Sequence, residues 1–265
     1  PYVLESFNKE AGTITFVVNE KYPRQPKVEK IVYQLFGNED TMYLALQQGD
    51  IDMVWAYSTG VAGTYQDVLA GDANVSLINV AAANAPAVLA FNNAKGLFTN
   101  EDLRQAVSYA LDYDAFRTYF GSAYAEIPNR GFVPATTVGY KDTEKLTTDA
   151  SKADEYMKAA GYTEKNADGF YVNADGQAAA FTLTVNAAKE THVGYAEMIK
   201  TQLEAFGIQV NLDTVDKDAY NAKTSNKFSE NNITMEAAIY GYTAAGMGMG
   251  NGLGSIYVDG NHAVQ

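Results

Sequence analysis

The sequence predicts an α/β fold in which mixed, mostly parallel sheets are flanked by helices. Short runs rich in β-branched and aromatic residues recur along the chain, and segments with helix-capping signals separate them. In the second half, strand, helix and strand follow one another, as in sheets whose parallel strands are joined by crossover helices. The chain has 265 residues, 47% of them apolar. This is enough to bury a substantial core in one large domain or two modest ones.

The chain opens on a strand-like pattern at Pro1 and Tyr2. Two further strands are predicted over Thr13–Val18 and Val28–Phe36, which are rich in β-branched and aromatic residues. The turn-like segment Tyr22–Pro26 separates them. We therefore expect these two strands to be neighbours in one sheet.

A helix is predicted after Asn38, whose side chain is a good N-cap and is followed by two acids at the positive end of the helix dipole. The helix runs to about Gln48, and Gly49 ends it. The apolar residues that follow predict a short buried strand over Ile51–Trp55.

A boundary between two lobes is predicted near Ala85. Another strand is expected over Asn74–Ala81, and the small, Pro-terminated segment that follows it suits a crossing between lobes. Residues 1–85 are then part of a first lobe, and residues 86–265 form a second, larger lobe.

The larger lobe continues the alternation of strands and helices. Two Asn-Ala-Asp-Gly turns, at Asn166 and Asn173, predict hairpins around Phe170–Val172. An irregular Gly/Pro segment is expected over Gly121–Gly139. Strands are predicted over Val88–Asn92, Ala180–Asn186, Gln209–Val215 and Thr234–Tyr240, and helices over Asn100–Leu111, Ser151–Ala160, Val193–Phe206 and Lys217–Ser225.

Composition excludes several classes of protein. The net charge of −13 repels nucleic-acid backbones and anionic lipid head groups, so no nucleic-acid partner is expected. The chain contains no cysteine, which excludes disulfides, thiolate metal sites and a cysteine nucleophile. No apolar run is long enough to cross a bilayer, and the first residues do not form a secretory signal.

Five segments, in this order, give the chain its resemblance to a known family. The sequence is similar to the extracytoplasmic solute-binding proteins, family 5, of peptide, nickel and related ABC importers. The matching segments are PYVLESF from Pro1, LALQQGDIDMVW at Leu44–Trp55, the FNN…LRQAVSYALD stretch within Pro86–Asp112, ADEYMKAAGY at Ala153–Tyr162 and YAEMIKTQLEAFGIQVNLDTVD at Tyr195–Asp216.

The resemblance implies a type II periplasmic-binding-protein fold with two lobes and a hinge cleft. It implies a protein that captures a peptide or another small polar solute without chemistry or cofactor. Such a protein works as a monomer, in the periplasm or at the outer face of the cell membrane, and delivers its solute to ABC permease subunits. Contact with the membrane is expected only through the permease or a lipid anchor outside this sequence. By the same comparison the chain is an internal fragment, with family segments preceding Pro1 and following Gln265.

Ligand-binding residues are expected after strand ends. Trp55 and Tyr57 follow the DIDMV segment of the predicted strand, at positions that face the ligand in similar peptide-binding proteins. Tyr242, Thr243 and Ala245 follow the last strand. Peptide binders of the family have at the place of Ala245 an acid that holds the ligand's α-ammonium, and a methyl group cannot replace that hydrogen bond.

Two further residues complete the predicted site. Asn92 ends its strand, and Met247 offers adaptable apolar contact within the glycine-rich loop Gly246–Gly254. That loop does not have the G-x-G-x-x-G spacing of a dinucleotide site, nor a P-loop lysine. We interpret it as a loop at the edge of the cleft.

Other interpretations of these residues remain open. Trp55 also suits a core position, and His262 with Met247 or Met249 suits contact with a metal complex, although no metal site is predicted. Asp50 and Asp52 form a pair of carboxylates at a turn, but an enzymatic role lacks a G-x-S-x-G motif, an H-E-x-x-H motif or a histidine near a serine. The alternatives to transport are an α/β hydrolase and a ligand sensor or chaperone on the same fold.

Overall fold

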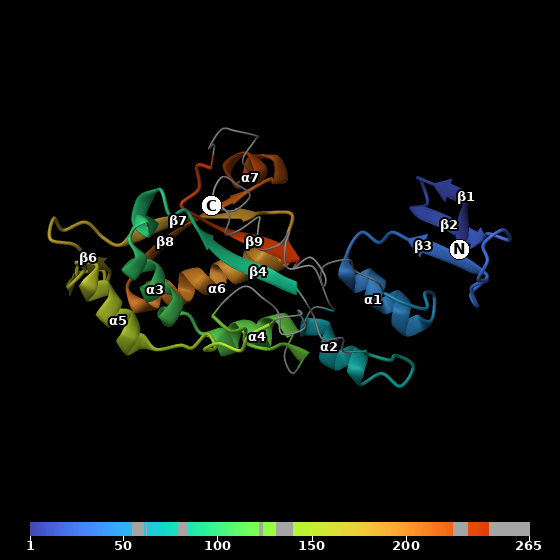
Figure 1. Ribbon diagram of the computed structural model, residues 1–265, viewed down its shortest axis with the longest axis horizontal. Coiled ribbons are helices and arrows are strands. Elements are labelled where there is room, and N and C mark those ends of the chain that lie inside the picture. The colour runs from blue at the N-terminus through green and yellow to red at the C-terminus, as the bar shows by residue number, and fades with distance from the viewer. Residues whose placement is uncertain are drawn as a thin grey trace. The chain divides into compact units, whose positions relative to one another are not determined.

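The computed structural model describes residues 1–54, 61, 63–78, 84–121, 124–130, 140–224 and 233–243 (Figure 1). Contacts divide the chain into unit 1, Pro1–Ala56 with Asp67–Leu77, and unit 2, Tyr57–Gln66 with Ile78–Gln265. The last change of unit precedes the predicted boundary at Ala85, because the strand that begins at Asn84 pairs within unit 2. The division into two binding lobes stays a prediction.

Unit 1 contains a three-stranded antiparallel sheet in the order β1-β2-β3. The strands are β1 (Tyr2–Asn8), β2 (Thr13–Val18) and β3 (Lys30–Gln34). Val3 lies opposite Val17, and Ile14 lies opposite Tyr33. The prediction that the second and third strands are neighbours is confirmed.

Helix α1 (Glu39–Gln48) of unit 1 has the predicted ends. The Oδ1 of Asn38 accepts a hydrogen bond from the N–H of Thr41 at 2.9 Å. Gly49 ends the helix with φ 80°, a left-handed conformation that glycine adopts without steric cost. Helix α2 (Gly63–Ala70), which was not predicted from the sequence, includes residues of both units.

Two predicted strands are wrong in their described parts. Residues 51–54 and 74–78 form no strand, and the side chains of Met53 and Ile78 are 72% and 77% exposed. The Oδ1 of Asp72 instead accepts from the N–H of Asn74 at 2.9 Å, in a turn. A short apolar run predicts a strand only where a neighbouring strand takes its backbone hydrogen bonds, and sequence does not reveal that neighbour.

Unit 2 contains a four-stranded sheet in the order β4-β9-β7-β8. The strands are β4 (Asn84–Phe91), β7 (Ala180–Asn186), β8 (Gln209–Val215) and β9 (Ala237–Thr243). β7 is parallel to both β8 and β9, and β4 is an antiparallel edge strand. The predicted mixed, mostly parallel sheet is confirmed for this unit.

The helices of unit 2 largely follow the predicted pattern. Helix α4 lies in a segment for which the sequence predicted no element. The helical elements are η1 (Gly96–Thr99), α3 (Glu101–Ala110), α4 (Tyr113–Gly121), α5 (Ala150–Ala159), α6 (Glu190–Phe206) and α7 (Lys217–Thr224).

The unit 2 sheet is covered on both faces, as predicted (Figure 1). Phe181, Leu183 and Val185 alternate along β7 and pack into one buried cluster with residues of α3, α5 and α6. On the opposite face, Ala238 of β9 packs in a second cluster with Tyr220 of α7. α7 therefore covers the face opposite α6.

The Asn-Ala-Asp-Gly turns form the predicted hairpins. Strands β5 (Glu164–Lys165) and β6 (Tyr171–Val172) pair antiparallel across the first turn, whose Gly169 N–H donates to the carbonyl of Asn166 at 3.0 Å. Val172 bridges to Ala178 across the second turn. Among the described helices, none combines the length and apolar character needed to span a bilayer.

Candidate functional site

The carboxyl ends of three parallel strands meet at one edge of the unit 2 sheet. β7 ends at Asn186, β8 at Val215 and β9 at Thr243, while β4 begins beside Thr243 at Asn84. Ligands of open α/β sheets bind outside the carboxyl ends of the strands. We call the residues at these strand ends the carboxyl edge.

The pairing between β7 and β9 stops before the strands reach this edge. Its ladder joins Leu183 to Ala237 and Thr184 to Ala238. From Ile239 onward, the described β9 residues pair with β4, and that ladder is irregular between Ala85 and Val88. The end of β9 is therefore held on one side by an irregular ladder, and its other side is not paired with β7.

A tight turn after β7 brings the start of a long helix to the carboxyl edge. Asn186 is buried, and its Oδ1 accepts from the N–H of Ala188 at 3.0 Å. The N–H of Ala187 donates to the carbonyl of Val215 at 2.8 Å, which joins the turn to β8. Lys189, at the N-cap position of the 17-residue helix α6, makes no side-chain capping bond. The first N–H groups of α6 thus add partial positive charge here.

A second helix begins at the same edge, after β8. The Oδ1 of Asp216 accepts from the N–H groups of Asp218 and Ala219, each at 2.9 Å, and so caps α7. Neither Asp216 nor the turn at Asn186 was predicted to be part of a site. Their position in the sequence could have indicated one, because Asn186 ends a predicted parallel strand and Asp216 directly follows another.

The structure brings two of the predicted site residues to the carboxyl edge. Tyr242 and Thr243 are the last residues of β9, paired with Ala85 and Asn84. The other predicted residues after strand ends and in the glycine-rich loop, Trp55, Tyr57, Ala245 and Met247, lie outside the described residues. His262 and Met249 lie outside them as well.

Asn92 lies at the opposite edge of the sheet, because β4 runs antiparallel to β9. It is buried, its Nδ2 donates to the carbonyl of Met235 at 2.9 Å, and its Oδ1 accepts from the N–H of Ala94 at 3.1 Å. These contacts connect β4 to the start of β9. A ligand-binding role for Asn92 stays a prediction, and none of these contacts supports it.

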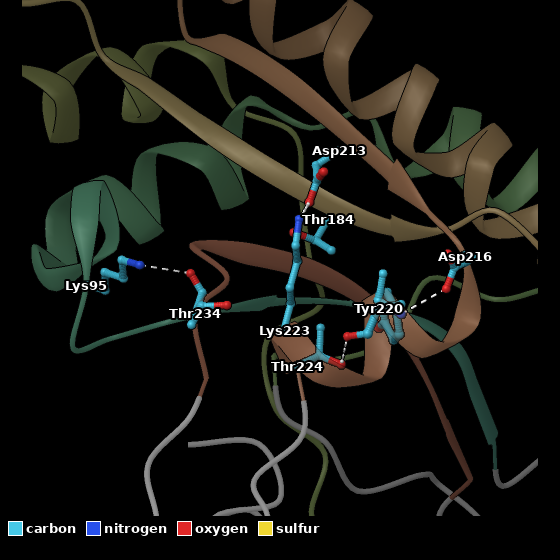
Figure 2. A network of polar contacts seen from close by, with 9 residues as sticks. Lys95, Thr184, Asp213, Asp216, Tyr220, Lys223, Thr224 and Thr234 are labelled. Carbon is cyan, nitrogen blue, oxygen red and sulfur yellow. Dashed lines mark hydrogen bonds and ion pairs between the residues drawn. The ribbon is translucent and has the colours of Figure 1, made fainter.

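A polar network on the α7 face fixes that helix beside the sheet (Figure 2). The Nζ of Lys223 lies 2.5 Å from Oδ2 of Asp213, which also accepts from the buried Thr184 hydroxyl at 3.2 Å. Because the carboxylate is held by a lysine and a threonine, it is engaged in structural bonds. Among the described residues, no group of three or more His, Asp or Glu side chains is placed to hold a metal ion.

The sequence matches a known protein family, and the fold matches solved structures. The model of the bacterial extracellular solute-binding proteins, family 5 (middle region), matches residues 1–261. NikA from Brucella suis, solved with Fe(III)-EDTA, superposes with a TM-score of 0.80 at 18% identity over 91% of this chain and 47% of that protein. The periplasmic binding protein DppA from Helicobacter pylori, solved with the peptide STSA, gives a TM-score of 0.70 at 24% identity over 96% and 44% of the two chains.

A curated relative is similar over part of the chain. A probable ABC transporter-binding protein from Deinococcus radiodurans is 27% identical over 158 residues, which are 57% of this chain and 25% of that protein. This chain thus spans about half the length of the two solved relatives and a quarter of the curated one.

The fold is that of type II periplasmic binding proteins, as the resemblance implied. The family is described as extracellular, which places the chain outside the cytoplasm as expected. The family is described as one of solute-binding proteins, and the two solved relatives hold a metal chelate and a peptide. Since the family model matches nearly the whole sequence, this chain belongs to the bacterial extracellular solute-binding proteins of family 5.

Proposed function

We propose that this chain is part of a solute-capturing component of an ABC importer. Membership of family 5 over residues 1–261 is the observation that carries the proposal. Such a component binds its solute outside the cytoplasm and delivers it to permease subunits. It acts without a cofactor, as a monomer, and releases the solute chemically unchanged.

The carboxyl edge of unit 2 is the proposed half-site for the solute. Tyr242 and Thr243 lie at this edge, where the start of α6, which has no side-chain cap from Lys189, offers backbone hydrogen-bond donors. Trp55, Tyr57, Ala245 and Met247 complete the site in the proposal. A solute that contacts residues 1–85 and residues 86–265 together stabilises a closed form, because it gains contacts there that the open form lacks.

The solute class that we favour is a short peptide or another small polar molecule. The similar DppA was solved with a peptide, whereas the similar NikA was solved with a metal chelate. Ala245 stands where peptide binders of the family have an acid, so a free α-ammonium loses a charge-assisted hydrogen bond. That loss lowers affinity by about one to two powers of ten.

The test is a titration monitored by the fluorescence of Trp55, the single tryptophan of the chain. Tetrapeptide pools, Fe(III)-EDTA and sugar pools are added separately, and a saturable change with one of them identifies the class. Calorimetry on a Trp55→Phe variant shows whether Trp55 contacts the solute or only reports its binding, because only the loss of a contact changes the affinity. Mass spectrometry of the recovered solute distinguishes binding from hydrolysis.

Two results would contradict the proposal. Recovery of a cleaved peptide would favour an α/β hydrolase. Saturable binding that survives truncation of Tyr242 and Thr243 side chains to alanine, in a folded protein, would move the site away from the carboxyl edge.

A further inference from the structure

Two tyrosine hydroxyls join α7 to β9 in opposite directions. The hydroxyl of Tyr220, on α7, donates to the carbonyl of Ile239 on β9 at 2.7 Å. The hydroxyl of Tyr240, on β9, donates to the carbonyl of Thr224 at the end of α7 at 2.7 Å. The two rings meet edge to face, with their centroids 6.0 Å apart. We call this pair of contacts the tyrosine clamp.

The clamp lies in a largely dry part of unit 2. Tyr220 is 8% exposed and packs with Ala90, Ile233, Met235 and Ala238. Burial raises the pKa of both phenols above the ordinary value of 10.0, so each hydroxyl keeps its proton and remains a donor at neutral pH. Hydrogen bonds in such surroundings exchange little with water and hold their partners in defined positions.

The clamp acts at the point where β9 loses pairing with β7. Ala238 is the last β9 residue in that ladder, and Ile239, whose carbonyl receives the Tyr220 hydroxyl, is the next. Beyond it, β9 pairs with β4 through an irregular ladder. The two clamp contacts thus support the part of the strand that has the least support from the sheet.

Helix α7 is itself fixed at both ends, so it can act as a rigid support (Figure 2). Asp216 caps its first turn, and the ion pair between Lys223 and Asp213 joins its last turn to β8. The hydroxyl of Thr224 also donates to the carbonyl of Tyr220 at 2.8 Å, within the helix. Because α7 is bound to both strands, it holds β9 in a fixed position relative to β8.

We propose that Tyr220 and Tyr240 are positioning residues of the solute site, which hold the end of β9 so that Tyr242 and Thr243 meet the solute at the carboxyl edge. The inference rests on the proposed function. Neither clamp residue touches the solute. Binding sites need their contact groups held within a fraction of an ångström, and a loosened strand must be ordered again by each solute molecule that binds.

The test compares three single variants that each lose one phenolic hydroxyl. Tyr220→Phe and Tyr240→Phe remove the clamp bonds, and Tyr171→Phe is the matched control. Tyr171 is also buried, and its hydroxyl donates to Oδ1 of Asp154 at 2.7 Å, between α5 and β6 and away from β9. All three are expected to lower the unfolding temperature slightly.

Affinity separates positioning from stability. The ligand is the tetrapeptide pool or Fe(III)-EDTA, whichever saturates the unaltered protein. Each clamp variant is expected to bind this ligand three- to tenfold more weakly, at a temperature where the variant is folded. Tyr171→Phe is expected to bind as the unaltered protein does. Equal affinity in all three variants, or an equal loss in all three, would overturn the proposal.

Hydrogen exchange tests the clamp without any solute. Amides of residues 239–243 are expected to exchange faster in both clamp variants, while those of β8 and α6 keep their rates. Unchanged exchange in β9 would overturn the proposal even if affinity falls. If the unaltered protein binds neither probe, short peptides and metal chelates fail as its solutes, and the exchange experiment still decides whether the clamp positions β9.

Discussion

The carboxylate of Glu236 accepts a hydrogen bond from the backbone N–H of Thr182, with 2.7 Å between Oε2 and N. Thr182 and Glu236 each lie one residue before the first pair of the β7–β9 ladder, Leu183 and Ala237. A side chain therefore extends this short ladder at its amino end. At the other end the hydroxyl of Tyr220 donates to the carbonyl of Ile239, the first β9 residue beyond the ladder with β7.

Glu236→Ala is expected to destabilise unit 2, because it leaves the N–H of the partly buried Thr182 without its acceptor. The expected loss is about 1–3 kcal/mol in the free energy of unfolding. Glu236→Gln keeps an acceptor oxygen and is expected to lose less. Urea unfolding measures both, and equal losses in the two variants would mean that the hydrogen bond is not the cause.

Gly96→Ala is expected to be destabilising for two separable reasons. Gly96 has φ +64°, and a Cβ there would overlap Oε1 of Glu236. The left-handed conformation alone costs about 1–2 kcal/mol for an alanine. Gly161 has φ +89° with no atom within 4 Å of a built Cβ, so Gly161→Ala measures the conformational cost alone.

The excess loss in Gly96→Ala over Gly161→Ala reports the contact with Glu236. In a Glu236→Ala background this excess is expected to disappear, because the overlapping carboxylate is gone. Thermal unfolding of the two single variants and the double variant makes the comparison. An excess that persists in the double variant would assign the strain to another contact.

Gly63→Ala is expected to weaken the packing of α2 against α4. A Cβ at Gly63 would lie 2.7 Å from the carbonyl oxygen of Tyr119 and 3.2 Å from that of Phe120. These are backbone atoms, so relief requires movement of a helix, and the expected cost is about 1–3 kcal/mol. At Gly71 a Cβ would have ordinary contacts at 3.4 Å and beyond, so Gly71→Ala is the control. Equal unfolding temperatures for the two variants would contradict the close approach.

Asp154 is expected to contribute to unfolding in acid. Hydrogen bonds from Lys158 and then from the Tyr171 hydroxyl lower the pKa of its carboxyl below the ordinary value of 3.8. Because the folded-state pKa is the lower one, the stabilisation is complete above the unfolded pKa and is lost as pH falls through the folded pKa. Asp154→Asn is therefore expected to flatten the fall of stability below about pH 4.

Tyr171→Phe provides an intermediate case, because it removes the second cause and leaves Lys158 in place. Its stability is expected to fall with pH less steeply than that of the unaltered chain and more steeply than that of Asp154→Asn. Chemical unfolding between pH 2 and pH 6 measures the three slopes. Identical slopes for all three proteins would remove Asp154 as a source of acid sensitivity.

The sequence by itself determined the elements whose signals are local. Asn38 and Gly49 mark the ends of α1, the Asn-Ala-Asp-Gly turns mark two hairpins, and β7 has the predicted bounds. Capping, turn formation and side-chain alternation depend on residues within a few positions of one another, so they are visible in sequence. The ordered motifs also predicted the family that the comparisons show.

The tertiary structure decided the sheet order, the end of the β7–β9 pairing and the edge at which each candidate residue lies. Asn92 directly follows β4 and Thr243 ends β9. Because β4 runs antiparallel to β9, the two residues nevertheless lie at opposite edges of the sheet. The side chain of Asn92 donates to the carbonyl of Met235, which lies 143 positions away. The hydroxyl of Tyr220 donates to the carbonyl of Ile239 in β9, which lies 19 positions away. Such pairings depend on contacts between residues distant in sequence, and no local pattern encodes which partners a strand end will meet.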